Sequence, residues 1–109
     1  MQTITITTKP ISINAMYRGR RFLTPDAKAT KESMAWEVAT QYKQEPMTLD
    51  IKLTVRFYVD NARIDIDNYL KGLLDCLTGL LWKDDRYIYE LHVYKIIERD
   101  NPRVEIDIQ

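Results

Sequence analysis

Residues 49–59 read Leu-Asp-Ile-Lys-Leu-Thr-Val-Arg-Phe-Tyr-Val, and residues 67–80 read Asp-Asn-Tyr-Leu-Lys-Gly-Leu-Leu-Asp-Cys-Leu-Thr-Gly-Leu. Apolar and polar residues alternate in the first stretch, which is typical of a strand with one buried face. Leucines recur every three or four residues in the second, which predicts a helix with one broad apolar face. The fold is therefore expected to place a helix soon after a half-buried strand.

Patterns on either side of this pair predict the remaining elements. Thr24-Pro25 opens a second helix, with a hydroxyl at the N-cap and a proline at the first helical position, and that helix is expected to end near Gln44. The stretch before it, residues 10–21, carries proline, serine, asparagine and glycine and is expected to be a loop. The alternating patterns predict strands at residues 3–7, 49–59, 87–97 and 103–108.

The predicted order is strand, helix, strand, helix, strand, strand. Clean alternation within the strands favours a sheet that is covered on one face only. We therefore expect an α+β fold in which two helices pack on one face of a single small mixed β-sheet. No repeat or linker interrupts the chain, so residues 1–109 are expected to form one domain.

The composition is that of an ordinary globular protein, with 45% hydrophobic and 29% charged residues. The formal net charge is zero, which argues against binding nucleic acid by bulk charge. Neither a signal peptide nor an apolar run long enough for a membrane span is recognised, and the single Cys76 fits a reducing compartment. We expect a cytoplasmic protein with no membrane partner.

Acidic residues gather around the second predicted helix. Asp65 and Asp67 lie at its start, Lys71 comes one turn after Asp67, and Asp84-Asp85 follow its end. Two carboxylates spaced by two residues in extended chain point to the same side, where they can hold one hydrated divalent cation. The turn after the helix is expected to return a third carboxylate to this pair. The pattern therefore predicts a divalent-metal site.

Such a site favours phosphodiester hydrolysis, because carboxylates that hold one or two metal ions can activate water and stabilise an in-line displacement at phosphorus. Lys71 lies one turn after Asp67 and either pairs with that acid or contacts a phosphate. Basic residues that could hold a DNA backbone are Arg18, Arg20 and Arg21, which form the one tight basic cluster, and Arg63, which lies beside the acids.

The ordered set resembles the RusA family of Holliday junction resolvases. The stretch Asp65-Ile-Asp67-Asn68-x-x-Lys71-x-x-x-Asp75-x-Leu77, followed by Trp82-Lys83-Asp84-Asp85, is similar to the family's acidic signature. An N-terminal stretch also looks like the family's loop: Pro10-x-Ser12-x-Asn14-x-x-Tyr17-Arg18. The resemblance covers most of the chain, because the strand–helix–strand frame between the motifs agrees as well.

This resemblance implies roles for individual residues. The family's essential carboxylates fall on Asp65, Asp67 and Asp85, with Asp84 adjacent, and its lysine falls on Lys71. It further implies a homodimer, dependent on Mg²⁺ or Mn²⁺, that resolves four-way DNA junctions by paired nicks in recombination and repair. Because the family is common in phages and prophages, the expected location is the cytoplasm of a bacterial host cell.

Other interpretations stay open from the sequence alone. The acids at residues 65 and 67 can serve as helix caps and solvated turn residues, and Lys71 can be a plain helix-surface partner of Asp67 or Asp75. A branched-DNA-binding module without catalysis would share the fold and the arginines. A small protein-interaction domain would carry the acids as surface charge only.

Overall fold

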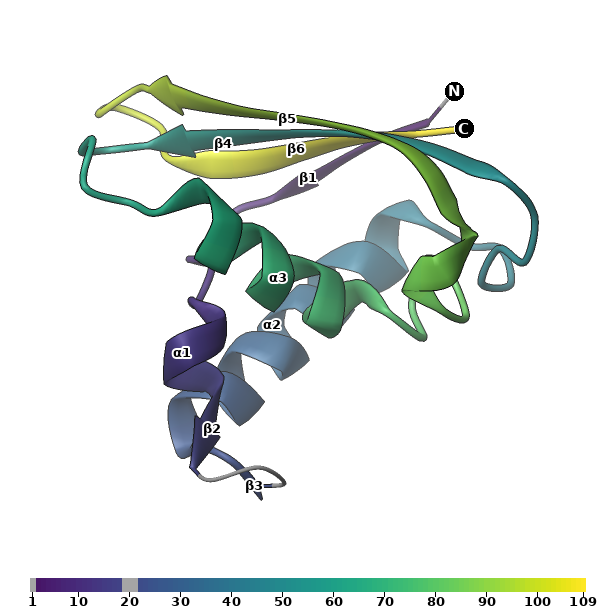
Figure 1. Ribbon diagram of the computed structural model, residues 1–109, viewed down its shortest axis with the longest axis horizontal. Helices are drawn as coiled ribbons and strands as arrows, with labels where there is room; N and C mark the ends of the chain where they lie inside the picture. The colour runs from purple at the N-terminus through teal and green to yellow at the C-terminus, as the bar shows by residue number, and fades with distance from the viewer. Residues whose placement is uncertain (1, 19–21) are drawn as a thin grey trace.

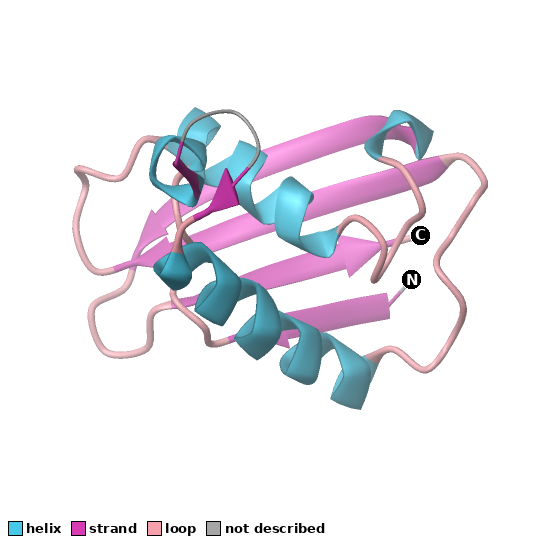
Figure 2. Cartoon of the chain, turned by 90° about the horizontal axis from the view of Figure 1, so that it is seen from below, coloured by secondary structure: helices cyan, strands magenta, loops and turns pink. Residues whose placement is uncertain are grey.

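Four strands form one mixed sheet, and the helices lie on one of its faces (Figures 1 and 2). The computed structural model describes residues 2–18 and 22–109. The elements are β1 (Gln2–Ile6), α1 (Ile13–Met16), β2 (Tyr17–Arg18), β3 (Phe22–Leu23), α2 (Pro25–Gln41), β4 (Ile51–Val59), α3 (Ile66–Leu77), the 3₁₀ turn η1 (Asp85–Tyr87), β5 (Ile88–Ile97) and β6 (Arg103–Ile108).

The strands lie in the order β1-β6-β4-β5. Strand β6 is antiparallel to both β1 and β4, whereas β4 and β5 run parallel, so α3 lies in the crossover that parallel strands require. This arrangement confirms the predicted α+β fold with a mixed sheet covered on one face. Strands β1 and β5 form the two edges of the sheet.

The core lies between the sheet and the helices. Every second residue of β4 is buried, as the alternating pattern predicts, and α3 buries Leu73 and Leu77 against that face. Helix α2 contributes Ala27, Met34 and Val38 to the same core. It begins at the predicted N-cap, where the Thr24 hydroxyl accepts a hydrogen bond from the Ala27 amide.

The prediction of a loop over residues 10–21 is wrong in part. A short helix, α1, brings Met16 fully into the core, and β2 and β3 pair as a small hairpin. The physical reason is tertiary packing, since the Ile11 carbonyl lies against Gly72 of α3. Propensity alone does not favour a helix of four residues.

Strand β5 is unusual because it exposes apolar side chains on both of its faces. Leu91 and Ile97 lie beside the buried Leu53 and Val59 of β4, yet they are 40% and 43% exposed. Tyr94 and Ile96, on the opposite face, are also exposed. We refer to these four residues of the edge strand as the β5 apolar edge.

Within residues 2–18 and 22–109, no helix combines the length and the apolar character that crossing a bilayer requires.

Candidate active site

Asp65 is the N-cap of α3. Its Oδ1 atom accepts hydrogen bonds from the backbone amides of Asp67 at 3.1 Å and Asn68 at 3.4 Å. The Asn68 side chain donates to Oδ2 at 3.1 Å, so both carboxylate oxygens have partners. A negative charge at this position also interacts favourably with the helix dipole. The capping role considered from the sequence is therefore real, and it fixes the direction of the Asp65 carboxylate.

Asp67 lies inside the first turn of α3, not in extended chain as expected. It forms an ion pair with Lys71, with 3.4 Å between Oδ2 and Nζ, and the side chains are 68% and 60% exposed. Such exposed pairs contribute little to stability. The exposure leaves both charged groups available to solvent, and therefore to a metal ion or a phosphate.

Asp84 and Asp85 lie beyond the opposite end of α3. Helix α3, whose twelve residues include Asp67, is about 18 Å long and lies between the two acidic pairs. Asp84 caps η1 by accepting a hydrogen bond from the Arg86 amide at 3.0 Å, and both acids are exposed. The expectation that the turn returns a third carboxylate to Asp65 and Asp67 is wrong for a single chain.

The turn after α3 is held in place by contacts with the segment that precedes β4. Trp82 is fully buried, and its indole nitrogen donates to the Thr78 hydroxyl at 3.1 Å. The backbone on either side of Trp82 bonds to Met47, through Leu81 O at 2.9 Å and Lys83 N at 3.1 Å. This anchoring holds the segment near the chain that precedes β4, far from the start of α3.

A divalent cation does not fit one chain as a three-carboxylate site. Among the described residues, no three His, Cys, Asp or Glu side chains are grouped closely enough to hold a metal ion. The donor chemistry itself is suitable, because both ends of α3 present exposed carboxylates, the ligands that Mg²⁺ and Mn²⁺ prefer.

Lys95 is a residue that the sequence analysis missed. Its Nζ atom donates to the carbonyls of Ala62 and Ile64, each at 3.0 Å, and so reaches from β5 to the segment that leads into Asp65. Its position carried a signal, because Lys95 interrupts the alternating apolar series of Leu91, Val93 and Ile97.

Basic residues border a hollow beside the start of α3. The hollow has a volume of about 220 Å³ and is lined by Lys9, Asp60, Asn61, Arg63, Ile64 and Tyr69. Arg63 is exposed, and its amide is held by the Asn61 side chain at 2.9 Å. Lys9 comes from the far end of the chain, so sequence spacing gave no sign that it lies beside Arg63.

The structure describes only part of the predicted arginine cluster. The backbone of Arg18 lies in β2. Arg20 and Arg21 lie outside the described residues. The hairpin that carries the cluster is joined to α3 through its first residue, because the Tyr17 hydroxyl donates to Asp75 Oδ2 at 2.6 Å. Asp75 also lies 3.8 Å from the Lys31 amine, so it does not pair with Lys71 as considered from the sequence.

The sequence matches a described family over nearly its full length. The family model "Endodeoxyribonuclease RusA" matches residues 5–109. A crossover junction endodeoxyribonuclease RusA of Aquifex aeolicus is 32% identical over 94 residues, which cover 84% of this chain and 74% of that protein. The protein of the same name in Escherichia coli K12 is 27% identical over 114 residues, which cover 99% and 95%. An uncharacterized Bacillus subtilis protein, YqaN, is 44% identical over 45 residues, 41% of this chain and 31% of its own length.

Proposed function

The chain belongs to the RusA family of endodeoxyribonucleases, and we propose that it resolves four-way DNA junctions by metal-dependent hydrolysis of phosphodiester bonds. The observation that carries this proposal is the family match over residues 5–109, which includes both acidic pairs and Lys71. Other features are compatible with a DNA substrate, because exposed carboxylates and a basic-rimmed hollow lie side by side at the start of α3.

We further propose that two copies of the chain are needed to complete each metal site. Asp65 and Asp67 are separated from Asp84 and Asp85 by the length of α3, about 18 Å, so one chain cannot offer all of them to one ion. A second copy can supply the missing carboxylate if its α3 runs in the opposite direction. The homodimer expected from the family resemblance is then a requirement for catalysis.

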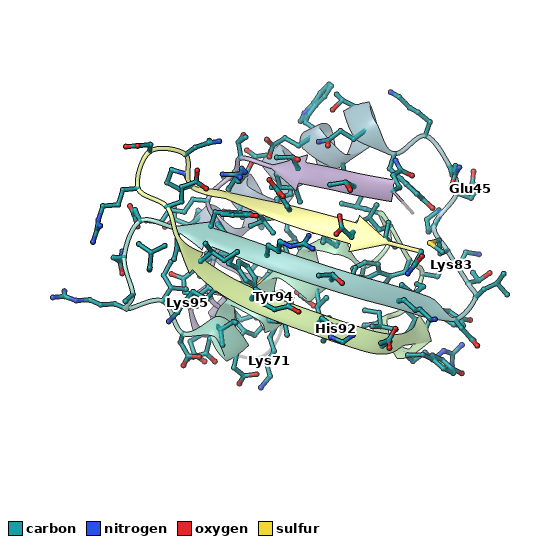
Figure 3. All side chains as sticks on the ribbon, turned by 90° about the horizontal axis from the view of Figure 1, so that it is seen from above. Glu45, Lys71, Lys83, His92, Tyr94 and Lys95 are labelled. Carbon is teal, nitrogen blue, oxygen red and sulfur yellow. The ribbon has the colours of Figure 1, made fainter. Side chains whose placement is uncertain are left out.

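The β5 apolar edge is the surface that best supports such a dimer. It combines an unpaired edge strand with exposed Leu91, Tyr94, Ile96 and Ile97, a combination that soluble monomers normally avoid. Figure 3 looks down on the sheet and shows Lys71 extending past this same edge. The proposed contact surface therefore lies next to the charged face of α3.

Twofold symmetry would bring the separated acids together. Strand β5 begins directly after η1, which carries Asp85, and its last residue, Ile97, pairs with Val59 near the segment that leads to Asp65. An isologous contact makes each surface meet its own copy in the reverse direction. With the axis across the middle of β5, the Asp85 end of one copy approaches the Asp65 end of the other.

In this arrangement Asp65 and Asp67 of one copy, with Asp85 and neighbouring Asp84 of the other, would hold Mg²⁺ or Mn²⁺. The bound ion supplies Lewis-acid stabilisation of the reacting phosphate and a water of lowered pKa. The Asp65 cap keeps its carboxylate oriented, and Lys71 is available to contact a phosphate or a leaving oxygen. Lys9 and Arg63 would hold the DNA backbone nearby, and we assign the same task to Arg18, Arg20 and Arg21.

A subunit-mixing experiment tests both the activity and the shared site. Asp67→Asn and Asp85→Asn are each expected to abolish nicking of a synthetic four-way junction with Mg²⁺ or Mn²⁺. After subunit exchange, a mixture of the two would contain dimers with one intact site, and about one quarter of the wild-type number of sites should return. Recovery of nicking therefore supports a site built from both ends of α3.

A matched mixture provides the control. Asp65→Asn mixed with Asp67→Asn removes two acids from the same end of α3, so every dimer carries two damaged sites and no recovery is expected. Failure of the first mixture to recover, after exchange is verified by labelled subunits, would contradict the shared site. Wild-type protein that binds junctions but never cuts them with either metal would contradict the enzymatic function itself. The relatives are bacterial, and we place the activity in bacterial cytoplasm, with a phage or prophage origin.

A further inference from the structure

We infer that Lys95 is a positioning residue that holds the start of α3, and with it Asp65, in the orientation needed to bind metal. This inference rests on the proposed function. The ammonium group of Lys95 reaches from β5 to the two carbonyls of Ala62 and Ile64, at 3.0 Å each. The Ile64 carbonyl belongs to the peptide bond whose nitrogen is that of Asp65, so Lys95 holds the peptide unit from which Asp65 projects.

The surroundings of Lys95 explain why this contact is specific. Lys95 lies beside the buried Phe57 of β4, on the sheet face that packs against the helices. Its neighbours on that face of β5 are Val93 and Ile97. The Lys95 side chain is exposed, and its two hydrogen bonds to carbonyls hold the ammonium group against the segment that leads into α3.

The two hydrogen bonds join β5 to the segment between β4 and α3, beside Ile64 and Ile66, which pack against the core. Residues 60–65 connect the end of β4 to α3, and their other side-chain hydrogen bonds are short-range. Asn61 donates to Asp60 and accepts from the Arg63 amide, and Asp65 accepts from Asp67 and Asn68. Lys95 comes from an adjacent strand 31 residues away from Ile64. It therefore ties the segment that leads into α3 to the sheet.

This position has a consequence for catalysis that a general stabilising role lacks. Asp65 accepts from the Asp67 and Asn68 amides, so a shift in the Ile64–Asp65 peptide would reorient the cap and both acids together. Misplacement of reacting groups by about 1 Å can lower turnover by about 10²-fold while substrate binding is retained. Loss of the Lys95 bond is expected to act in this way.

The test compares three variants of the full-length protein. Lys95→Met keeps the aliphatic stem and removes the donors, and Lys95→Arg keeps a cation that can still donate. Lys52→Met is the matched control, because Lys52 is an exposed strand lysine on the sheet face opposite the helices. Each is assayed for kcat and KM on a four-way junction, for Mn²⁺ affinity by calorimetry, for Tm, and for amide hydrogen exchange.

Lys95→Met is expected to lower kcat by about 10- to 100-fold with KM changed by less than about threefold. Weaker Mn²⁺ binding and faster exchange of the Asp67 and Asn68 amides should accompany the loss, and Lys95→Arg should recover most of both. Lys52→Met should behave as wild type. Unchanged kcat and exchange in Lys95→Met would overturn the inference, and so would a rise in KM at unchanged kcat, which would indicate a direct DNA contact instead.

The outcome is separable from failure of the proposed function. If the wild-type protein cuts no DNA, the nuclease proposal fails, but amide exchange and Mn²⁺ affinity still decide whether Lys95 positions the start of α3. If the wild type cuts junctions and Lys95→Met matches it in every measurement, only the inference about Lys95 fails.

Discussion

The hydroxyl of Tyr17 donates to Asp75 Oδ2 over 2.6 Å, and this bond joins residues 58 positions apart in the sequence. Tyr17 begins the hairpin that carries the predicted arginine cluster, whereas Asp75 belongs to α3, the helix between the two acidic pairs. The Lys31 amine, 3.8 Å from the same oxygen, adds α2 to the cluster. The Asp75 carboxylate therefore links the β2–β3 hairpin to both α2 and α3.

Removing the Tyr17 hydroxyl should destabilise the fold and weaken DNA binding together. Tyr17→Phe is expected to lower the free energy of unfolding by about 1–2 kcal/mol, because a partly buried hydrogen bond to a charged group is lost. Urea unfolding and junction binding measure the two effects. Arg56→Lys, which alters an ion pair on the opposite face of the sheet, serves as the control for DNA binding. Junction binding by Tyr17→Phe equal to that of wild type would argue against a role in orienting the hairpin.

The hydrogen bond between Tyr17 and Asp75 also makes the stability of the fold depend on pH. Donation to Asp75 and burial raise the pKa of Tyr17 from its usual 10.0 to about 12. Because the folded pKa lies above the unfolded one, this group's contribution to stability is fully present below pH 10 and is lost as pH rises toward 12. Tyr17→Phe should therefore reduce the loss of stability between pH 10 and 12, as measured by urea unfolding at each pH.

Gly72 should not tolerate a side chain. A methyl group there would meet the Ile11 carbonyl oxygen at 2.1 Å, and backbone cannot rotate aside as a flexible side chain can. Gly72→Ala is expected to lower the free energy of unfolding by about 1–3 kcal/mol, although alanine is the better helix former. Thermal unfolding of Gly79→Ala provides a comparison that separates steric overlap from backbone strain. Gly79 has open space around it, but its φ of 93° strains alanine. A Gly72→Ala protein more stable than wild type would contradict the close packing.

The Gly72 contact also shows which part of the fold could not be predicted from the sequence. The strands and long helices follow from periodicity and caps, as Thr24 and the alternation of β4 illustrate, because each signal is local. Helix α1 depends on Met16 entering the core and on Ile11 approaching Gly72, contacts between distant parts of the chain. Leu49, expected to point inward, is 75% exposed because β4 begins only at Ile51.

The site could be predicted only in part, because α3 holds its acidic residues apart. The residue types and their order predict a site with the acids at 65, 67, 84 and 85, but they do not reveal how far apart these acids lie. A helix of twelve residues is a rigid spacer of about 18 Å, and it places the two acidic pairs at opposite ends. The place of Lys95 in the apolar series of β5 was a signal, but its partners are backbone carbonyls, which the amino-acid sequence does not identify.

Cys76 should react slowly with thiol reagents in the native protein. Its side chain is 4% exposed, and burial raises its pKa from 9.0 to about 11, against the smaller opposite effect of Lys31. A two-unit rise leaves about 100-fold less thiolate near neutral pH. Labelling at pH 8 should therefore be at least about 100-fold slower than in urea, and should accelerate through pH 9–10 without a plateau. Rapid labelling of the folded protein would contradict the burial of Cys76 against the core.

Asp65 allows its structural role to be separated from its proposed catalytic one. Asparagine is as good an N-cap as aspartate, so Asp65→Asn should change the free energy of unfolding by less than about 0.5 kcal/mol, whereas Asp65→Ala should cost about 1 kcal/mol. Both variants lose the negative charge, and both should lose metal-dependent junction cleavage and most Mn²⁺ affinity. Urea unfolding, calorimetry and a cleavage assay measure the three effects, with Asp60→Asn as a control acid on the same loop. Cleavage retained by Asp65→Asn would mean that this carboxylate serves α3 as a cap and nothing more.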